Sequence, residues 1–178
     1  ILKNLSSASI AFYVIATILL LFALASREIR GVSSWIIFKN FTFEPAELAK
    51  LSLVILLAKY FSQKHVEIYH ARHILASAVY ALIPAALTFS QPDLGSVIVL
   101  VSIWLAMLLF SGIKRNHLLV ILMVGSIIAT IGWFAILKPY QKDRLASFIN
   151  PYLDPRGSGY NLLQAKTAIG SGQWLGIA

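Results

Sequence analysis

The chain has no cysteine and few charged residues, and both shortages narrow the classes of protein to which it can belong. Without cysteine there is no disulfide, thiolate metal site or catalytic thiol. Only 12% of its 178 residues are charged, whereas a soluble domain carries about a quarter. The mean hydropathy is +0.78 and 58% of the residues are hydrophobic. These values exclude an ordinary soluble domain and predict a membrane protein.

Acidic residues are scarcer than basic ones, 7 against 15, which gives a net charge of +8. In a soluble chain this surplus would suggest nucleic-acid binding. Here the bases lie between apolar runs, where they would flank lipid headgroups or meet anionic lipid substrates. We therefore expect membrane lipids as partners and no nucleic acid. The sequence does not begin with Met and its last residues resemble the middle of a protein, so we also expect a piece of a longer chain.

Apolar stretches near the length of a membrane-spanning helix recur along the chain and predict an all-α, polytopic transmembrane helix bundle. The second stretch is the weakest, because Lys50 and Lys59 lie inside it. The expected crossings are residues 5–25, 45–61, 74–90, 94–110 and 118–137. Residues 138–178 hold half of the ten glycines and predict a structured loop, with a short helix over Tyr160–Ile169 closed by Gly170–Gly172. Counting bases on the two sides does not fix the orientation, because the short loops carry most weight in that rule.

Glu47 and Lys50 form the first candidate constellation, at the start of the second crossing. They are three residues apart, which places them on one helix face near the headgroup level. A structural ion pair and a substrate-contacting pair explain the spacing equally well. Asp93 follows Ser90 at the spacing of a capping box, so capping is its default role and a contribution to a polar cavity is the alternative.

Bases and aromatic residues gather after the fifth crossing, around Tyr140, Lys142 and Arg144. Two interpretations of this cluster stay open. The general one is that these side chains anchor the chain at the membrane interface, and the more specific one is that they bind a phosphate or pyrophosphate group. Trp35 fits an interfacial anchor. The histidines are irregularly spaced, with Glu67 the one carboxylate close to them, so we expect no metal site.

Four segments together resemble the SEDS family of bacterial cell-wall proteins, in their residues, order and spacing. They are Gly31–Ile36, Glu44–Lys50, Gln91–Gly95 and Gly157–Gly172. The resemblance implies a multi-pass protein of the bacterial cytoplasmic membrane, with the glycine-rich loop outside. It also implies a peptidoglycan glycosyltransferase that polymerises lipid II into glycan strands beside a monofunctional transpeptidase, a class B penicillin-binding protein. The run Asp154–Asn161 is closer to the elongation (RodA) branch than to the division (FtsW) branch.

The resemblance implies a mechanism in which an acceptor hydroxyl attacks the anomeric carbon of a lipid-pyrophosphate donor. Lys50, Lys142 and Arg144 would stabilise the departing undecaprenyl pyrophosphate, with Glu47 orienting Lys50. No cofactor is evident; a divalent cation stays open, but the sequence offers no site for one. Trp35, Tyr140 and Tyr160 would line the lipid or sugar path. Asp93 and Gln164 complete the residues expected to bind the substrate or the lipid pyrophosphate.

The sequence departs from the family pattern in places that bear on this mechanism. Ser34 stands where the family has Arg, Glu44 where it has Gln, and Gln173 where it has Gly. The carboxylate that the family uses as its base matches no residue here, so we expect no catalytic base in this piece. A lipid flippase or non-catalytic lipid carrier is the main alternative, since it needs the same basic groove but no base. A purely structural scaffold would leave Glu47 and Lys50 without a purpose.

Overall fold

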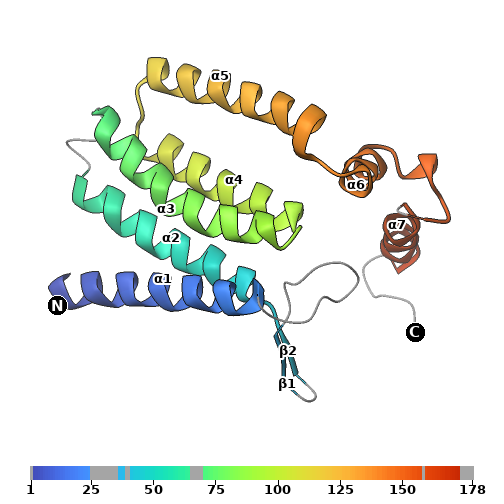
Figure 1. Ribbon diagram of the computed structural model, residues 1–178, viewed down its shortest axis with the longest axis horizontal. Helices are drawn as coiled ribbons and strands as arrows, with labels where there is room; N and C mark the ends of the chain where they lie inside the picture. Colours follow the sequence, from blue (N-terminus) through green and yellow to red (C-terminus); the bar gives the residue numbers. More distant parts are fainter. Residues whose placement is uncertain (1, 25–35, 39–40, 65–69, 158, 173–178) are drawn as a thin grey trace. The chain divides into compact units, whose positions relative to one another are not determined.

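The computed structural model describes residues 2–24, 36–38, 41–64, 70–157 and 159–172 (Figure 1). The chain divides into two compact units, Ile1–Leu119 and Val120–Ala178, and the division falls within α5. Helices make up most of both units, which confirms the all-α bundle. One element was not expected: a hairpin of two three-residue strands in which Ile36 pairs with Phe43.

The helices of the first unit, and α5 at its boundary, follow the predicted apolar stretches closely, because each stretch is long enough to form a continuous helix. Their bounds are α1 Leu2–Leu24, α2 Pro45–Lys64, α3 Ala71–Ser90, α4 Leu94–Phe110 and α5 Arg115–Ile131, with the hairpin strands at β1 Ile36–Phe38 and β2 Phe41–Phe43. Pro45 is the first residue of α2, where its missing N–H removes no helical hydrogen bond.

Four helices of the first unit pack into a bundle: α1 lies against α2, α3 lies against α4, and α2 contacts both α3 and α4. Leu20, Leu53, Leu57 and Leu100 are fully buried between them. Polar side chains join the helices as well. The Tyr13 hydroxyl donates to the Tyr80 carbonyl oxygen at 2.8 Å, and Nε1 of Trp104 donates to the Ser77 hydroxyl at 3.0 Å.

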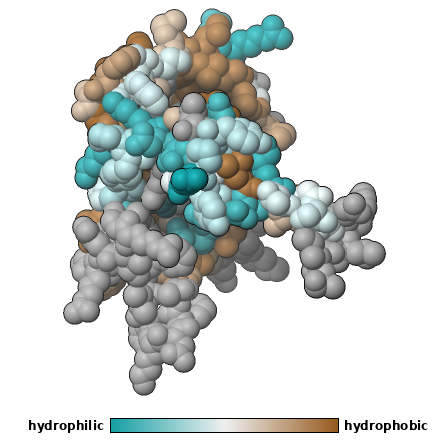
Figure 2. Space-filling model, turned by 90° about the vertical axis from the view of Figure 1, so that its right-hand side faces the viewer, coloured by the Kyte–Doolittle hydropathy of each residue, from teal (hydrophilic) through white to brown (hydrophobic). Residues whose placement is uncertain are grey.

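Three described helices are long and apolar enough to span a membrane: Ser7–Leu24, Ala71–Ser90 and Arg115–Ile136. The chain is therefore an integral membrane protein. α4 is apolar but shorter, at 17 residues, and α2 carries Glu47 and Lys50. That these two helices also cross the membrane stays a prediction. The face shown in Figure 2 carries hydrophilic residues over much of its described surface, with apolar residues at its margin.

The second unit is more helical than the sequence indicated. α5 ends in a π-helical turn, and two further helices with a 3₁₀ turn between them occupy the predicted loop. Their bounds are η1 Gly132–Ile136, α6 Pro139–Ile149, η2 Pro151–Leu153 and α7 Tyr160–Gly172. The helix predicted from Tyr160 is confirmed. Its predicted end is wrong, because α7 continues through the glycines to Gly172.

Candidate functional site

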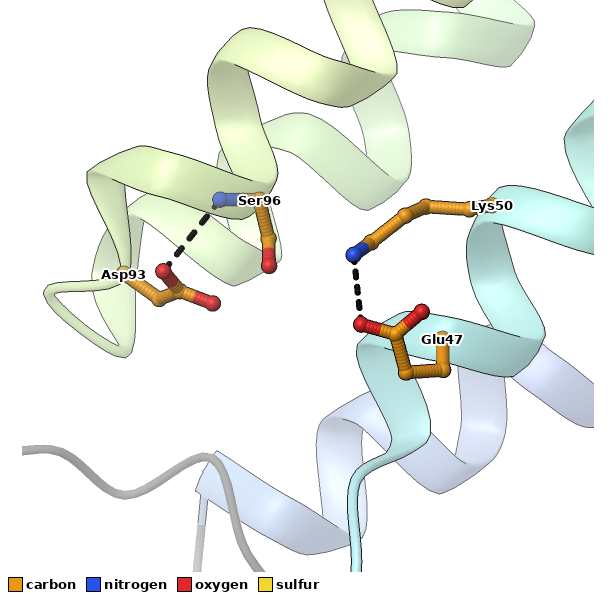
Figure 3. Close-up of polar contacts among 4 residues, drawn as sticks. All are labelled: Glu47, Lys50, Asp93 and Ser96. Carbon is orange, nitrogen blue, oxygen red and sulfur yellow. Dashed lines mark hydrogen bonds and ion pairs between the residues drawn. The ribbon is translucent and has the colours of Figure 1, made fainter. Parts of the chain in front are cut away.

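The start of α2 carries the predicted ion pair. Nζ of Lys50 lies 2.6 Å from Oε1 of Glu47, so the three-residue spacing does bring the two charges together (Figure 3). The pair is uneven: the Lys50 side chain is 17% exposed and the Glu47 side chain 63%. Most of the Lys50 side chain is thus covered by protein, while most of the Glu47 side chain is open to solvent.

Asp93 lies just before α4, on the side of the bundle where Lys50 projects (Figure 3). Its Oδ1 accepts a hydrogen bond from the Ser96 backbone N–H at 3.2 Å, so Asp93 is itself the N-cap of α4. The predicted capping box, with Ser90 as the cap, is wrong. The Ser90 hydroxyl instead donates to the Ala86 carbonyl oxygen within α3.

Gln91 positions the short turn that carries Asp93. Its side chain is fully buried, and Nε2 donates to the Leu20 carbonyl oxygen of α1 at 2.8 Å. This bond joins α1 to the turn between α3 and α4. Oε1 of Gln91 is also buried and accepts no hydrogen bond from the described part of the chain. An unpaired buried acceptor is costly, so the anchoring bond to Leu20 has to compensate for it.

Glu44 is a member of this site that the sequence did not indicate. It directly precedes α2, and burial raises the pKa of its carboxyl group; the negative charges of Asp93 and Glu47 raise it further, while Lys50 lowers it. The charge of Glu44 therefore interacts with the charges of Asp93, Glu47 and Lys50. The available sequence signal was its position directly before α2, three residues from Glu47.

The remaining predicted site residues that the structure describes lie in the second unit. Tyr140, Lys142 and Arg144 are on α6, and Tyr160 and Gln164 are on α7. Nζ of Lys142 lies 5.8 Å from the centre of the Trp133 ring, a cation–π contact that holds the base near the end of α5. Tyr160 and Gln164 are exposed. Trp35 lies outside the described residues.

The loop between α6 and α7 is built around Asp154. Its carboxylate accepts a hydrogen bond from the Gly157 N–H at 2.9 Å, and its carbonyl oxygen accepts one from the Gly159 N–H at 3.1 Å. A Cβ atom at Gly159 would overlap the Pro151 carbonyl oxygen, which is backbone and cannot move aside. Glycine is therefore required there. This turn sets where α7 begins, and with it the place of Tyr160.

No group of three or more His, Asp or Glu side chains among the described residues could hold a metal ion. The expectation of no metal and no cofactor stays a prediction. The first unit offers one cation, Lys50, paired with Glu47, and two further carboxylates, Glu44 and Asp93. The second unit, by itself, offers a set of bases and aromatic side chains on α6 and α7. Cations of this kind suit a phosphate or pyrophosphate group.

Comparison with known proteins decides the family. The family model described as "Cell cycle protein", for the FtsW, RodA and SpoVE proteins, matches residues 2–178. The chain belongs to this family. It is the SEDS family that the four sequence segments indicated, and the all-α bundle agrees with it.

Relatives in this family are named for peptidoglycan synthesis. "Probable peptidoglycan glycosyltransferase FtsW" of Nitrosococcus halophilus is 35% identical over 151 residues, 84% of this chain and 38% of the relative. The protein of the same name from Tolumonas auensis is 37% identical over 161 residues, 88% of this chain and 41% of the relative. The chain thus spans about two fifths of the length of these SEDS relatives.

Two solved structures share the fold. A chain in "Structural coordination of polymerization and crosslinking by a peptidoglycan synthase complex" matches 94% of this chain and 49% of its own length, with 31% identity and a TM-score of 0.73. The rod shape determining protein RodA of Thermus thermophilus matches 71% of this chain and 42% of its own length, with 30% identity and a TM-score of 0.58. Relatives from both the FtsW and RodA branches therefore resemble this SEDS chain.

Proposed function

We propose that the protein containing this chain is a peptidoglycan glycosyltransferase that polymerises lipid II into glycan strands. Family membership supports this activity, because the relatives bear that name. The observation that carries it within the chain is Lys50, whose side chain is 17% exposed and whose ammonium lies 2.6 Å from Oε1 of Glu47 near the start of α2. A fixed cation there suits the departing charge of a lipid pyrophosphate better than it suits a purely structural role.

In the proposed reaction the acceptor sugar hydroxyl attacks the anomeric carbon of the lipid-linked donor. A carbon–oxygen bond forms to the acceptor, the bond to the pyrophosphate oxygen breaks, and undecaprenyl pyrophosphate leaves with the bonding electron pair. The hydroxyl proton passes to a base that the family supplies outside this chain. Lys50 stabilises the leaving group and Glu47 orients the Lys50 ammonium. Lys142 and Arg144, on α6, are the further cations proposed for charge stabilisation.

We also propose where the protein works and which protein it works with. The protein works in the bacterial cytoplasmic membrane with residues 138–178 outside, beside a class B penicillin-binding protein that crosslinks the strands. A structural relative described as part of a complex for polymerization and crosslinking supports such a partner. The role in elongation rests on the run Asp154–Asn161, with division as the role of the related branch. Complementation of strains deficient in one process or the other distinguishes the two roles.

The experiment that tests the activity uses the full-length protein in detergent micelles with purified lipid II. Micelles have no second leaflet, so a flippase or lipid carrier has no transport to perform there. Glycan strands resolved by gel electrophoresis are the expected product. If the protein binds lipid II and forms no strands with its transpeptidase partner present, it is a carrier and the proposed activity is wrong.

A further inference from the structure

An open groove of about 310 Å³ lies between the C-terminal ends of α2 and α4. Its lining is largely apolar, with one hydroxyl near the end of each helix. The lining residues are Ala58, Phe61, Ser62, Met107, Phe110 and Ser111. All six belong to the first unit, so the groove is formed within one packed bundle.

The groove is separate from the site around Lys50. Phe61 lies eleven positions after Lys50 on α2, which is roughly 16 Å of helix at 1.5 Å per residue. α4 likewise begins beside Asp93 and ends at Phe110. The polar site and the groove therefore lie at opposite ends of the α2–α4 pair, and one ligand headgroup cannot occupy both.

Basic side chains surround this end of the bundle. Lys59 is three residues before Ser62 on α2, so both point to one side of the helix. Lys114 and Arg115 are exposed and follow Ser111 after a turn at Gly112, where a φ of +80° favours glycine. Within the described parts of 58–73 and 111–117 there is no acidic residue. The groove thus combines an apolar lining with a positively charged border.

We propose that the groove binds one acyl chain of an anionic phospholipid from the surrounding leaflet, namely phosphatidylglycerol. The apolar lining suits the acyl chain, and the groove is open so that a chain can enter from the bilayer. The hydroxyls of Ser62 and Ser111 and the charges of Lys59 and Arg115 suit the glycerol phosphate headgroup. A soluble phosphate would make no favourable apolar contact with Phe61 and Phe110, and a neutral lipid would have no net charge for the basic side chains to attract.

The test measures lipid retained by the full-length protein after extraction from nanodiscs of equal phosphatidylglycerol and phosphatidylcholine, by native mass spectrometry. We expect phosphatidylglycerol to be retained preferentially. Ala58→Trp fills the groove and should abolish retention, whereas Ala86→Trp, on an exposed face of α3, should keep it. The double variant Lys59→Gln, Arg115→Gln should lower the preference about 25-fold, because each base near a membrane surface favours an anionic lipid about fivefold. Arg156→Gln, in the second unit, is the charge control.

A photo-crosslinking amino acid at Met107 identifies the occupant directly. A crosslinked phosphatidylglycerol supports the proposal. A crosslink to another segment of the protein would show that the groove is filled by the protein itself and would overturn it. Equal retention of the two lipids by the wild type, or unchanged retention by Ala58→Trp, would also overturn it.

Discussion

At the scale of single residues, the ion pair of Lys50 and Glu47 is informative because its two members are exposed so differently. The Glu47 side chain, at 63% exposure, is in wide contact with solvent, whereas the Lys50 side chain, at 17% exposure, is largely covered by protein and has Glu47 as its counter-charge. Helical spacing alone predicted the contact. The exposed fractions of the two side chains could not be predicted from that spacing, because they depend on how helices from other parts of the chain pack around α2.

Replacing Lys50 by Met tests the role of the cation. We expect the full-length Lys50→Met protein to insert and fold, because Met fills a similar volume and Glu47 stays solvated. Polymerisation should fall at least about a hundredfold, as when one charge-stabilising donor is removed from an active site. The loss should appear in kcat when the initial rate of polymerisation is measured over a range of lipid II concentrations.

Leu51→Met is the matched control, on the same helix turn at an exposed position. It should retain wild-type turnover. Wild-type turnover in Lys50→Met, with correct size-exclusion behaviour, would remove Lys50 from the proposed mechanism and leave the pair a structural role.

Glu44 gives the site a pH dependence whose sign follows from its raised pKa. Burial and the charges of Asp93 and Glu47 disfavour its ionised form in the folded protein. Its contribution to stability is therefore complete below the ordinary pKa of glutamate and is lost as pH rises through the higher folded pKa. Glu44→Gln cannot ionise, so it should gain thermal stability over the wild type as pH rises from about 4 to 8.

The measurement is the difference in Tm between Glu44→Gln and wild type across that range, in detergent. Asn116→Gln is the control, because it changes an exposed side chain on α5 without adding or removing a titratable group. The difference in Tm between this variant and wild type should not change with pH. A wild type that becomes relatively more stable than Glu44→Gln as pH rises would contradict the direction of the pKa shift.

At the scale of elements, apolar length predicted the long helices well and missed the shorter polar ones. α4 begins and ends where the sequence placed it, at Leu94 and Phe110, because Asp93 caps it and a turn with Gly112 follows it. α6 was missed because Tyr140 to Arg144 shows no apolar run. Its start was nevertheless encoded: Pro139 opens the helix, and the buried Gln141 side chain accepts a hydrogen bond from the Lys138 N–H at 3.0 Å.

The turn before α7 yields a prediction about glycine. Gly159→Ala places a Cβ against the backbone of Pro151 and Asp154, so the turn must open. We expect a local cost of about 1–3 kcal/mol, as for overpacking elsewhere. Hydrogen exchange at the first turn of α7 should become faster in the full-length protein, and polymerisation should fall if this turn presents Tyr160 to substrate.

Gly170→Ala is the comparison within the same helix. A Cβ there meets nothing within 4 Å, and Ala is favoured over Gly in a helix by about 1 kcal/mol. It should leave exchange at the start of α7 unchanged. Identical behaviour of the two variants would mean that α7 does not depend on the Asp154 turn.

At the scale of the whole molecule, the candidate site residues fall into two sets that lie far apart in the sequence. Glu44, Glu47, Lys50 and Asp93 belong to the first unit, and Lys142, Tyr160 and Gln164 belong to the second. Apart from Glu44, sequence motifs indicated both sets because each is a local pattern. The orientation of the whole chain could not be predicted from composition, because the count of bases on the two sides does not separate bases that bind a substrate from bases that mark the cytoplasm.

The order of the helices fixes which segments of the chain lie on the same side of the membrane. If α2, α3, α4 and α5 each cross once, the end of α2 and the turn between α4 and α5 share one side, and α7 lies on the other. Our proposal places α7 outside. Single cysteines at Ser171, on α7, and at Gln63, near the end of α2, report the two sides, since both positions are exposed and the chain has no native cysteine.

In intact spheroplasts an impermeant maleimide should label Ser171→Cys and leave Gln63→Cys unlabelled, whereas permeabilised membranes should give labelling at both. The full-length protein, with any cysteines elsewhere replaced, supplies the unlabelled background. The reverse pattern would place α7 in the cytoplasm, where the bases of α6 would face no extracellular lipid pyrophosphate, and the proposed polymerisation outside the membrane would lose its site. Labelling of both positions in intact cells would mean that one helix between them does not cross, and α4, at 17 residues, is the first to examine.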